Sequence, residues 1–195
     1  ESAIGTAEPI ESISKAAPGV IASAGHPFVN GDNVLLEIQG MVELNGYLCK
    51  VVSVVAGVSF EVADVNGTTG IDTTLFSTFT SGTAKKVTLG ISITGVQDFN
   101  FAGGEIKVED TTTVNDTQDT QIVVGATAQS ADMTMQWDPA SSAQQAMIAA
   151  FKTRANKGFK VLWPDGAFTM WYGTVGYTGA PGGGKQGVTT SPAKI

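Results

Sequence analysis

The stretch from Met133 to Tyr172 constrains the fold most, because it holds several recognisable elements in succession. Apolar residues alternate with polar ones from Met133 to Trp137, which is the period of a half-buried strand. Asp138 and Pro139 then suit the N-cap and the first position of a helix. The apolar stripe of that helix consists of Ala143, Ala146, Met147, Ala150 and Phe151. The pattern predicts a helix over about residues 139–156.

The end of this stretch predicts a hairpin. Lys152, Arg154 and Lys157 suit the last turns of a helix, and Gly158 is a typical stop signal. A strand through residues 159–163, the turn Pro164-Asp165-Gly166 and a second strand through residues 168–172 follow. The expected order is therefore strand, helix, strand, turn, strand.

The rest of the chain indicates a mainly β protein. The 195 residues include 24 glycines, and no convincing helical stripe precedes residue 139. Turn signals such as Asn45-Gly46 and Asn66-Gly67 separate the short segments that read as strands. The expected strands are Val20–Ala24, Val34–Gln39, Leu48–Val55, Ser59–Val65 and Gly82–Lys86. Strands at this spacing predict a small sandwich or barrel.

Composition excludes several classes of function. The formal charge of −7 leaves no basic surface for wrapping nucleic acid. The chain has one cysteine, Cys49, and one histidine, His26, so it can form no internal disulfide, and it cannot form an ordinary zinc site without several carboxylates. No apolar run is long enough to span a membrane. We expect no metal and no cofactor.

Three weaker patterns in the sequence resemble functional motifs. The segment Gly179–Gln186 resembles a phosphate-binding loop, but Gln186 replaces the Ser or Thr and strand-forming residues follow, so we expect a hairpin loop. His26 lacks a nucleophile motif, although Ser23 or Cys49 could partner it in a hydrolase; we expect a structural histidine. Cys49 reads as a small residue of a strand. We expect no enzymatic activity.

The segment Glu105–Gln121 is the most polar part of the chain. Its carboxylates are those of Glu105, Glu109, Asp110, Asp116 and Asp119, and Lys107 is the only cation among them. The spacing does not fit a calcium loop. A segment with so little to bury is expected to be a mobile loop until a partner orders it.

Large aromatic residues mark the expected core and interfaces. They are Trp137, Phe151, Trp163, Trp171 and Tyr172. On the last strand Trp171 faces away from Tyr172, so both faces carry large aromatic groups and both need a cover. A helix can cover one face, and a neighbouring subunit is a natural cover for the other. This pattern favours assembly.

These elements resemble, in order, the C-terminal core of the major tail tube proteins of lambda-like long-tailed phages (siphoviruses). The residues that carry the resemblance are Trp137, Gln144-Gln145-Ala146, Phe151, Pro164-Asp165-Gly166 and Trp171-Tyr172-Gly173. The acidic segment before them also matches. The resemblance covers about residues 91–195 and implies a tail-tube β-sandwich or barrel with one helix.

A second resemblance covers residues 10–86. Its residues are Ile13–Val20, His26-Pro27-Phe28, Asn30-Gly31-Asp32, Glu43–Gly46 and Ser59–Val62. They are similar to a small all-β barrel module of phage tail proteins, related to the first catalytic-cysteine half-domain of ubiquitin-activating enzymes. That half-domain carries no catalytic cysteine, so Cys49 gains no role. We therefore expect a tube domain of residues 1–9 and 87–195, with residues 10–86 inserted as a module on the tube exterior.

The resemblance implies a structural virion protein. Subunits of such proteins form stacked hexameric rings, a conduit through which double-stranded DNA passes during genome ejection without sequence-specific binding. The implied partners are other copies of the chain, the tape measure protein and tail terminator or tip proteins. The implied location is the virion tail, after assembly in the host cytoplasm. A tail-associated adhesin or decoration protein, with a β module that binds host-surface glycans, is the alternative.

Overall fold

The computed structural model describes residues 2–64, 67–113, 117–183 and 188–195. The chain forms two compact units. The first, here called the barrel unit, comprises Glu1–Ser92 and Ala155–Thr174. The second, here called the helix unit, comprises Ile93–Arg154 and Val175–Ile195.

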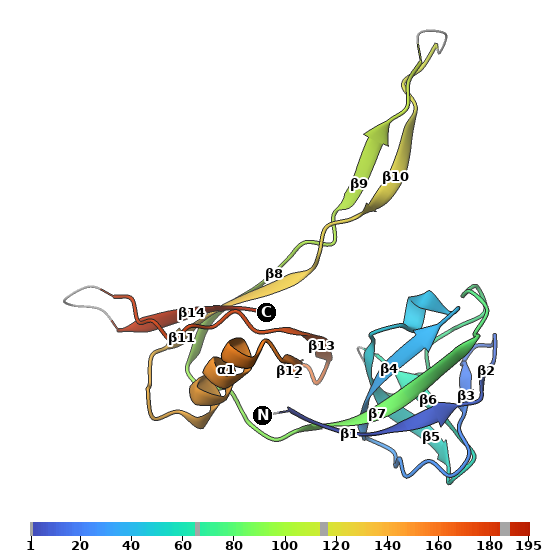
Figure 1. Ribbon diagram of the computed structural model, residues 1–195, viewed down its shortest axis with the longest axis horizontal. Coiled ribbons are helices and arrows are strands. Elements are labelled where there is room, and N and C mark those ends of the chain that lie inside the picture. Colours follow the sequence, from blue (N-terminus) through green and yellow to red (C-terminus); the bar gives the residue numbers. More distant parts are fainter. Residues whose placement is uncertain (1, 65–66, 114–116, 184–187) are drawn as a thin grey trace. The chain divides into compact units, whose positions relative to one another are not determined.

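A seven-stranded antiparallel sheet dominates the barrel unit (Figure 1). Its strands are β1 (Ser2–Ile10), β2 (Ser12–Ile13), β3 (Val20–Ala22), β4 (Asn33–Gln39), β5 (Leu48–Val55), β6 (Ser59–Ala63) and β7 (Ser81–Leu89), in the order β1-β7-β4-β5-β6-β3-β2. A short 3₁₀-helix, η1, spans Val42–Leu44. Because Glu11 alone separates β1 from β2, the two edge strands are consecutive parts of one segment. Ile10 pairs with Gly82 and Ser12 with Ala22, so the sheet closes on itself as a barrel.

Apolar side chains that alternate along these strands fill the barrel. The core consists of Ile10, Ile13, Ile21, Phe28, Val34, Leu36, Ile38, Met41, Leu44, Cys49, Val51, Phe60, Val62 and Ala84. The expected strands at 34–39, 48–55 and 82–86 lie within β4, β5 and β7. The expected strand end at Val65 lies outside the described residues. The predicted mainly β fold is confirmed.

A separate hairpin of β12 (Asn156–Leu162) and β13 (Phe168–Thr174) packs on the barrel. Gly158 marks the closest approach, because a Cβ atom there would lie 3.0 Å from Cγ1 of Val87 and 3.2 Å from Cδ2 of Leu48. Its N–H donates a buried 2.9 Å hydrogen bond to Oγ of Ser2. The expected role of Gly158 as a helix stop is therefore wrong, since the residue belongs to a strand whose backbone touches the barrel.

The helix unit contains a three-stranded antiparallel sheet and α1 (Ser142–Thr153). Its strands are β8 (Val96–Ala102), β11 (Ser130–Gln136) and β14 (Thr190–Lys194), in the order β14-β11-β8. Along β11 the odd-numbered residues Ala131, Met133 and Met135 are buried. On α1 the buried residues are Ala143, Gln144, Met147 and Ala150. The predicted alternation is present at Met133 and Met135, and the predicted helical stripe is also present, but Trp137 and Phe151 are exposed.

The helix is shorter than the expected 139–156. Ser141 is its N-cap residue, and Oδ1 of Asp138 instead accepts a hydrogen bond from the N–H of Ala140 in the preceding turn. Arg154 ends the helix in the left-handed conformation, with φ at 52°. The side chain of Asp138 therefore stabilises a local turn and does not cap the helix. The N-cap is Ser141, three residues after the predicted cap at Asp138.

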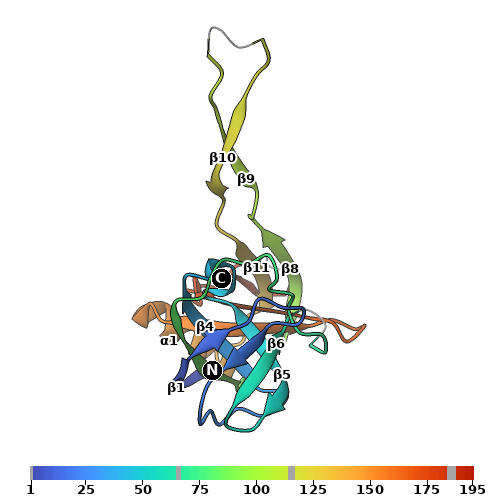
Figure 2. The ribbon, with the colours of Figure 1, turned by 90° about the vertical axis from the view of Figure 1, so that its right-hand side faces the viewer.

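A long hairpin extends from the sheet of the helix unit (Figures 1 and 2). It is formed by β9 (Ile106–Asp110) and β10 (Gln121–Ala126). Hydrogen bonds of Gly104 and Glu105 with Thr127 join it to the end of the β8–β11 pair. The expectation of an irregular loop over 105–121 is therefore wrong for residues 106–110, which form a strand. The polar composition of the segment did not indicate this strand, because the apolar residues Ile106 and Val108 alternate with charged residues.

The segments expected to flank the inserted module are paired with each other. β1 runs across residues 9 and 10, β7 runs across residues 86 and 87, and Ile4 pairs with Val87. Two adjacent antiparallel strands such as these can connect an inserted module to the domain that carries it. The proposed boundaries at 10 and 86 stay a prediction.

Candidate assembly surfaces

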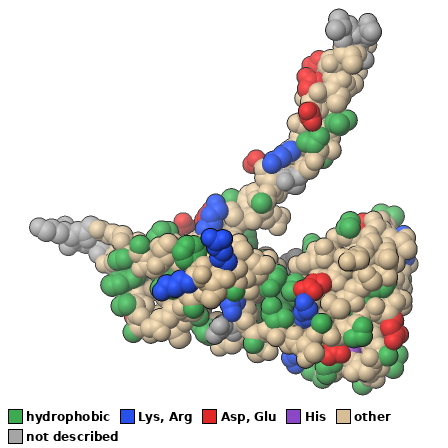
Figure 3. All heavy atoms as spheres, in the orientation of Figure 1, with side chains coloured by type: hydrophobic (Ala, Val, Ile, Leu, Met, Phe, Trp, Pro, Cys, Tyr) green, Lys and Arg blue, Asp and Glu red, His purple; other side chains and the backbone are tan. Residues whose placement is uncertain are grey.

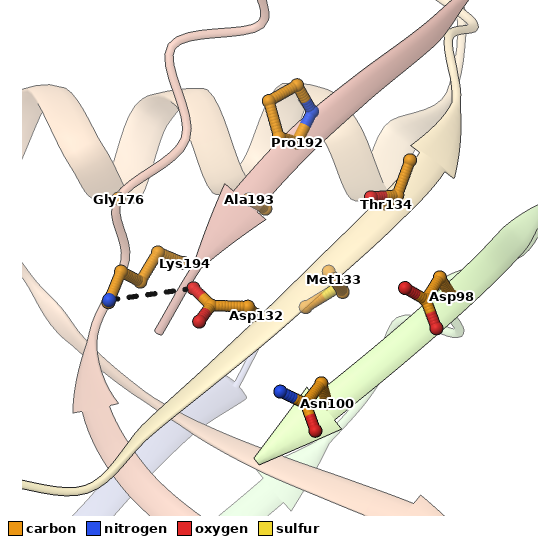
Figure 4. A pocket seen from close by; sticks show the side chains of 9 residues that line it. All are labelled: Asp98, Asn100, Asp132, Met133, Thr134, Gly176, Pro192, Ala193 and Lys194. Carbon is orange, nitrogen blue, oxygen red and sulfur yellow. Dashed lines mark ion pairs between the residues drawn. The ribbon is translucent and has the colours of Figure 1, made fainter. Parts of the chain in front are cut away.

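One face of the β14-β11-β8 sheet is polar and forms a shallow hollow (Figure 4). Asp132 lies opposite Asn100 and Lys194, and Thr134 lies opposite Asp98 and Pro192. Residues directly opposite in an antiparallel sheet share a face, so these side chains stand on the side away from Met133 and Met135. Nζ of Lys194 lies 3.7 Å from Oδ1 of Asp132, drawn as a dashed line in Figure 4.

The charged groups of this polar face are in contact with solvent. Both partners of the Lys194–Asp132 ion pair are about half-exposed, so solvent screens the pair and it adds little stability. Two carboxylates and one ammonium leave a net charge of −1 on the six side chains named above. The single histidine and the single cysteine of the chain both belong to the barrel unit. Among the described residues no group of His, Cys, Asp and Glu is arranged to hold a metal ion.

His26, Ser23 and Cys49 are core residues of the barrel. The His26 side chain is 4% exposed, and its ring lies 5.5 Å from that of Phe28 and 5.1 Å from that of Phe60. Nδ1 accepts a hydrogen bond from the N–H of Phe28, and Nε2 lies 3.3 Å from the carbonyl oxygen of Ser59. Oγ of Ser23 donates to the carbonyl of Pro9. Burial raises the pKa of the Cys49 thiol to about 12, so this group is no nucleophile at neutral pH.

The carboxylates predicted to act in assembly lie on or beside the β9–β10 hairpin. Glu105, Glu109, Asp110 and Asp119 are all exposed, and Asp116 lies outside the described residues. Asp110 is engaged locally, because Thr112 donates to it from its hydroxyl and from its backbone N–H; these bonds lower the pKa of that carboxyl. The hairpin therefore presents charge to solvent.

The same hairpin carries an exposed apolar stripe that composition did not reveal. Ile106, Val108 and Val123 share one face, since Val108 pairs with Val123 and Ile106 is two residues from Val108. Their exposed fractions are 66%, 53% and 67%. Figure 3 shows hydrophobic and acidic side chains next to each other along this hairpin. A two-stranded ribbon with exposed apolar residues is marginal in water by itself, so a contact that covers it would stabilise it.

The five aromatic residues expected in the core or interfaces are not fully buried. Trp137, Phe151 and Trp163 are exposed to about the same degree, near two-fifths. The ring of Trp171 stacks on Phe159 at 5.6 Å, and Tyr172 packs against the cluster of Leu35, Leu48 and Val87. A core role thus fits Tyr172, whereas an interface role for the three exposed rings stays a prediction.

Sequence reasoning missed a pair of lysines in the barrel unit. Nζ of Lys160 on β12 lies 4.5 Å from the ring centroid of Phe168, and Nζ of Lys50 on β5 lies 6.0 Å from the same centroid. Partial burial and the charge of Lys50 lower the pKa of Lys160. No motif could have signalled this pair, because the two residues lie on strands far apart in the sequence.

The glycine-rich segment 179–186 is described only in part. Gly184, Lys185 and Gln186 of the glycine-rich segment lie outside the described residues. Within the described part of that segment, Gly182 forms a bridge with Thr190, which agrees with the predicted hairpin loop. Among the helices of the described residues, none is both long and apolar enough to cross a membrane.

Comparison with known proteins identifies the family. A profile described as "Phage tail tube protein, TTP" matches residues 42–195, which is more than half of the chain. No curated protein matches the sequence. This family is one of structural proteins of the virion tail, and self-assembly into a tube follows from that role. With its mainly β fold and a match over most of its length, the chain belongs to the phage tail tube protein family.

Proposed function

We propose that this chain is the subunit of hexameric rings that stack into the tail tube of a siphovirus, through which the genome passes into the host. The match to the tail tube family carries the proposal. The exposed hairpin supports it, because an apolar stripe at 106, 108 and 123 needs a cover that repeated copies of one chain supply. The remaining partners would be the tape measure protein and the tail terminator or tip proteins.

The polar face of the β14-β11-β8 sheet suits the passage of DNA. Its carboxylates at Asp98 and Asp132 are exposed to solvent beside a single lysine, Lys194. A lumen lined by such groups repels phosphates weakly and stays hydrated, so a duplex would slide rather than bind. α1 lies on the opposite, apolar face of the sheet, in keeping with an outward position in the wall.

The barrel formed from residues 10–86 fits the exterior of the tube. A module of this size would fill a lumen that must pass a duplex. Because β1 and β7 pair side by side where the module begins and ends, it can project from the tube domain without interrupting it.

Electron microscopy of the purified full-length protein tests the main proposal. We expect rings with sixfold symmetry and a central channel, and stacked tubes at higher concentration. A protein that stays monomeric under all assembly conditions, and that is absent from the tail shaft of the virion, would contradict the proposal.

The β9–β10 hairpin is proposed to make the contact between neighbouring subunits or rings, through Glu105, Glu109, Asp110 and Asp119 and also Asp116. Deleting residues 109–118 should leave the rest of the chain folded, because the described side chains in that segment are exposed. The deletion should block stacking in electron micrographs. Tubes of normal length from the deletion variant would refute this role while leaving the tube function intact.

A further inference from the structure

We infer that a second copy of this chain docks its β9–β10 hairpin on a surface of the barrel unit formed by Lys50, Lys160 and Leu162. This surface is here called the lysine patch. The inference rests on the proposed tube function, and it names the receptor of the hairpin, which that function leaves open.

The lysine patch combines positive charge with an exposed apolar group. Lys160 and Leu162 point to the same side of β12, two residues apart, and Leu162 pairs with Phe168 across the hairpin. Leu162 is 67% exposed, whereas Phe168 is buried beneath the two ammonium groups. The stems of both lysines can therefore pack while their charges remain available.

Neither charge is neutralised within the described parts of the chain. Lys85 lies 2.7 Å from Glu37, Lys86 lies 2.7 Å from Asp32, and Lys194 is paired with Asp132. Lys50 and Lys160 have no such carboxylate among the described residues, and the ring of Phe168 brings them together instead. The two ammonium groups over one ring repel each other, and an incoming carboxylate would relieve that repulsion.

The hairpin is complementary to this patch in both respects. Glu109 and Asp119 are exposed acids toward the outer part of the hairpin, and Lys107 is the only cation of the segment 105–121. Ile106, Val108 and Val123 supply the apolar stripe beside them. A free phosphate or a nucleic acid would match the lysines alone, but it would leave Leu162 exposed. The hairpin covers both.

The hairpin is long enough to bridge two molecules. At about 3.4 Å per residue, the segment 105–113, which contains β9, would span about 30 Å when extended, and this is comparable to the diameter of a small domain. Every described side chain of β9 is exposed, so nothing in the helix unit covers it. In a tube of identical subunits each chain would donate one hairpin and receive one, as a repeating head-to-tail contact requires.

Charge reversal of either side tests the contact in the full-length protein. Lys50→Glu with Lys160→Glu should raise the critical concentration for tube growth by about tenfold or more, since each contact repeats along the tube. Glu109→Lys with Asp119→Lys should have a similar effect. Lys152→Glu with Arg154→Glu is the matched control, because it changes the net charge equally at two exposed positions, one in the last turn of α1 and one at its C-cap. A neutral variant, Lys50→Met with Lys160→Met, keeps the packing stems and should also assemble poorly while its thermal unfolding stays cooperative.

Mixing the two reversed variants then decides whether the contact joins two molecules. The acidic hairpin of one variant matches the lysine patch of the other, and the reversed pair also matches, so the mixture should form tubes that neither variant forms alone. Normal assembly of the patch variant, or failure of the mixture while one chain with all four substitutions assembles, would overturn the inference. So would a patch variant that assembles normally but no longer binds a DNA oligonucleotide. Absence of tubes from the unaltered protein would instead refute the proposed function.

Discussion

The hydroxyl of Tyr177 donates a buried hydrogen bond of 2.9 Å to Oε1 of Gln144. Gln144 also donates from Nε2 to the carbonyl of Gln136 at 2.7 Å, and its Oε1 accepts from the N–H of Asp138 at 3.2 Å. One buried amide thus ties the end of β11, the start of α1 and the segment before β14 together. Its satisfied polar groups orient the helix on the sheet.

Replacing Gln144 should destabilise the helix unit strongly. Gln144→Leu leaves the Tyr177 hydroxyl and the carbonyl of Gln136 without their partner, which costs about 2 kcal/mol or more. Chemical denaturation followed by circular dichroism measures the change. Gln145→Leu is the control, because Gln145 is exposed and should shift stability by only about 0.5 kcal/mol. Equal effects of the two substitutions would show that the buried network does not orient the helix.

A larger side chain at Gly158 should separate the β12–β13 hairpin from the barrel. The added carbons of Gly158→Val would collide with Val87 and Leu48, at a cost of about 1–3 kcal/mol. Differential scanning calorimetry should show a lower melting temperature. Thr174→Val on the neighbouring strand is exposed and serves as the control. An unchanged melting temperature for Gly158→Val would mean that the hairpin is not packed on the barrel at this point.

The Cys49 thiol should report on unfolding of the barrel. The side chain is fully buried, so a disulfide reagent at pH 8 should not react until denaturant opens the barrel. Burial raises the pKa of the Cys49 thiol from 9.0 to about 12. As the pH rises, the thiol therefore loses its proton at a lower pH in the unfolded chain than in the folded chain. The contribution of this group to stability is complete below pH 9 and declines between pH 9 and 12. Cys49→Ala should remove that part of the decline, and rapid labelling of the native protein would contradict its burial.

Charges on the apolar stripe of the hairpin should block assembly without unfolding the chain. Val108 and Val123 are exposed, so Val108→Lys with Val123→Lys should leave the melting temperature nearly unchanged. Tube growth, followed by light scattering and electron microscopy, should be lost. Val29→Lys with Val58→Lys places the same charges on exposed valines of the barrel unit and is the control. Loss of tubes in the control as well would make net charge, rather than the stripe, responsible.

Local patterns predicted much of the secondary structure correctly. The alternation that ends near Trp137, the stripe of α1 and the turn before Phe168 all depend on residues close in sequence. The predictions were wrong where a residue could take either of two roles in the local structure. Asp138 closes a turn rather than capping the helix, and Gly158 lies in a strand rather than ending a helix. The strand from Ile106 to Asp110 was missed because its charges dominated the composition.

By itself, the sequence determined the mainly β class, the single helical stripe and the order of elements by which the tail tube family could be recognised. Those properties follow from the spacing of apolar residues and from turn chemistry, which act over a few residues. Only the tertiary structure decided which residues meet across long separations. It closes the barrel through Ile10 and Ser12, buries Gln144 against Tyr177, and gathers Lys50 and Lys160 over Phe168. Such contacts depend on strand pairing and packing between distant segments, and no short pattern encodes them.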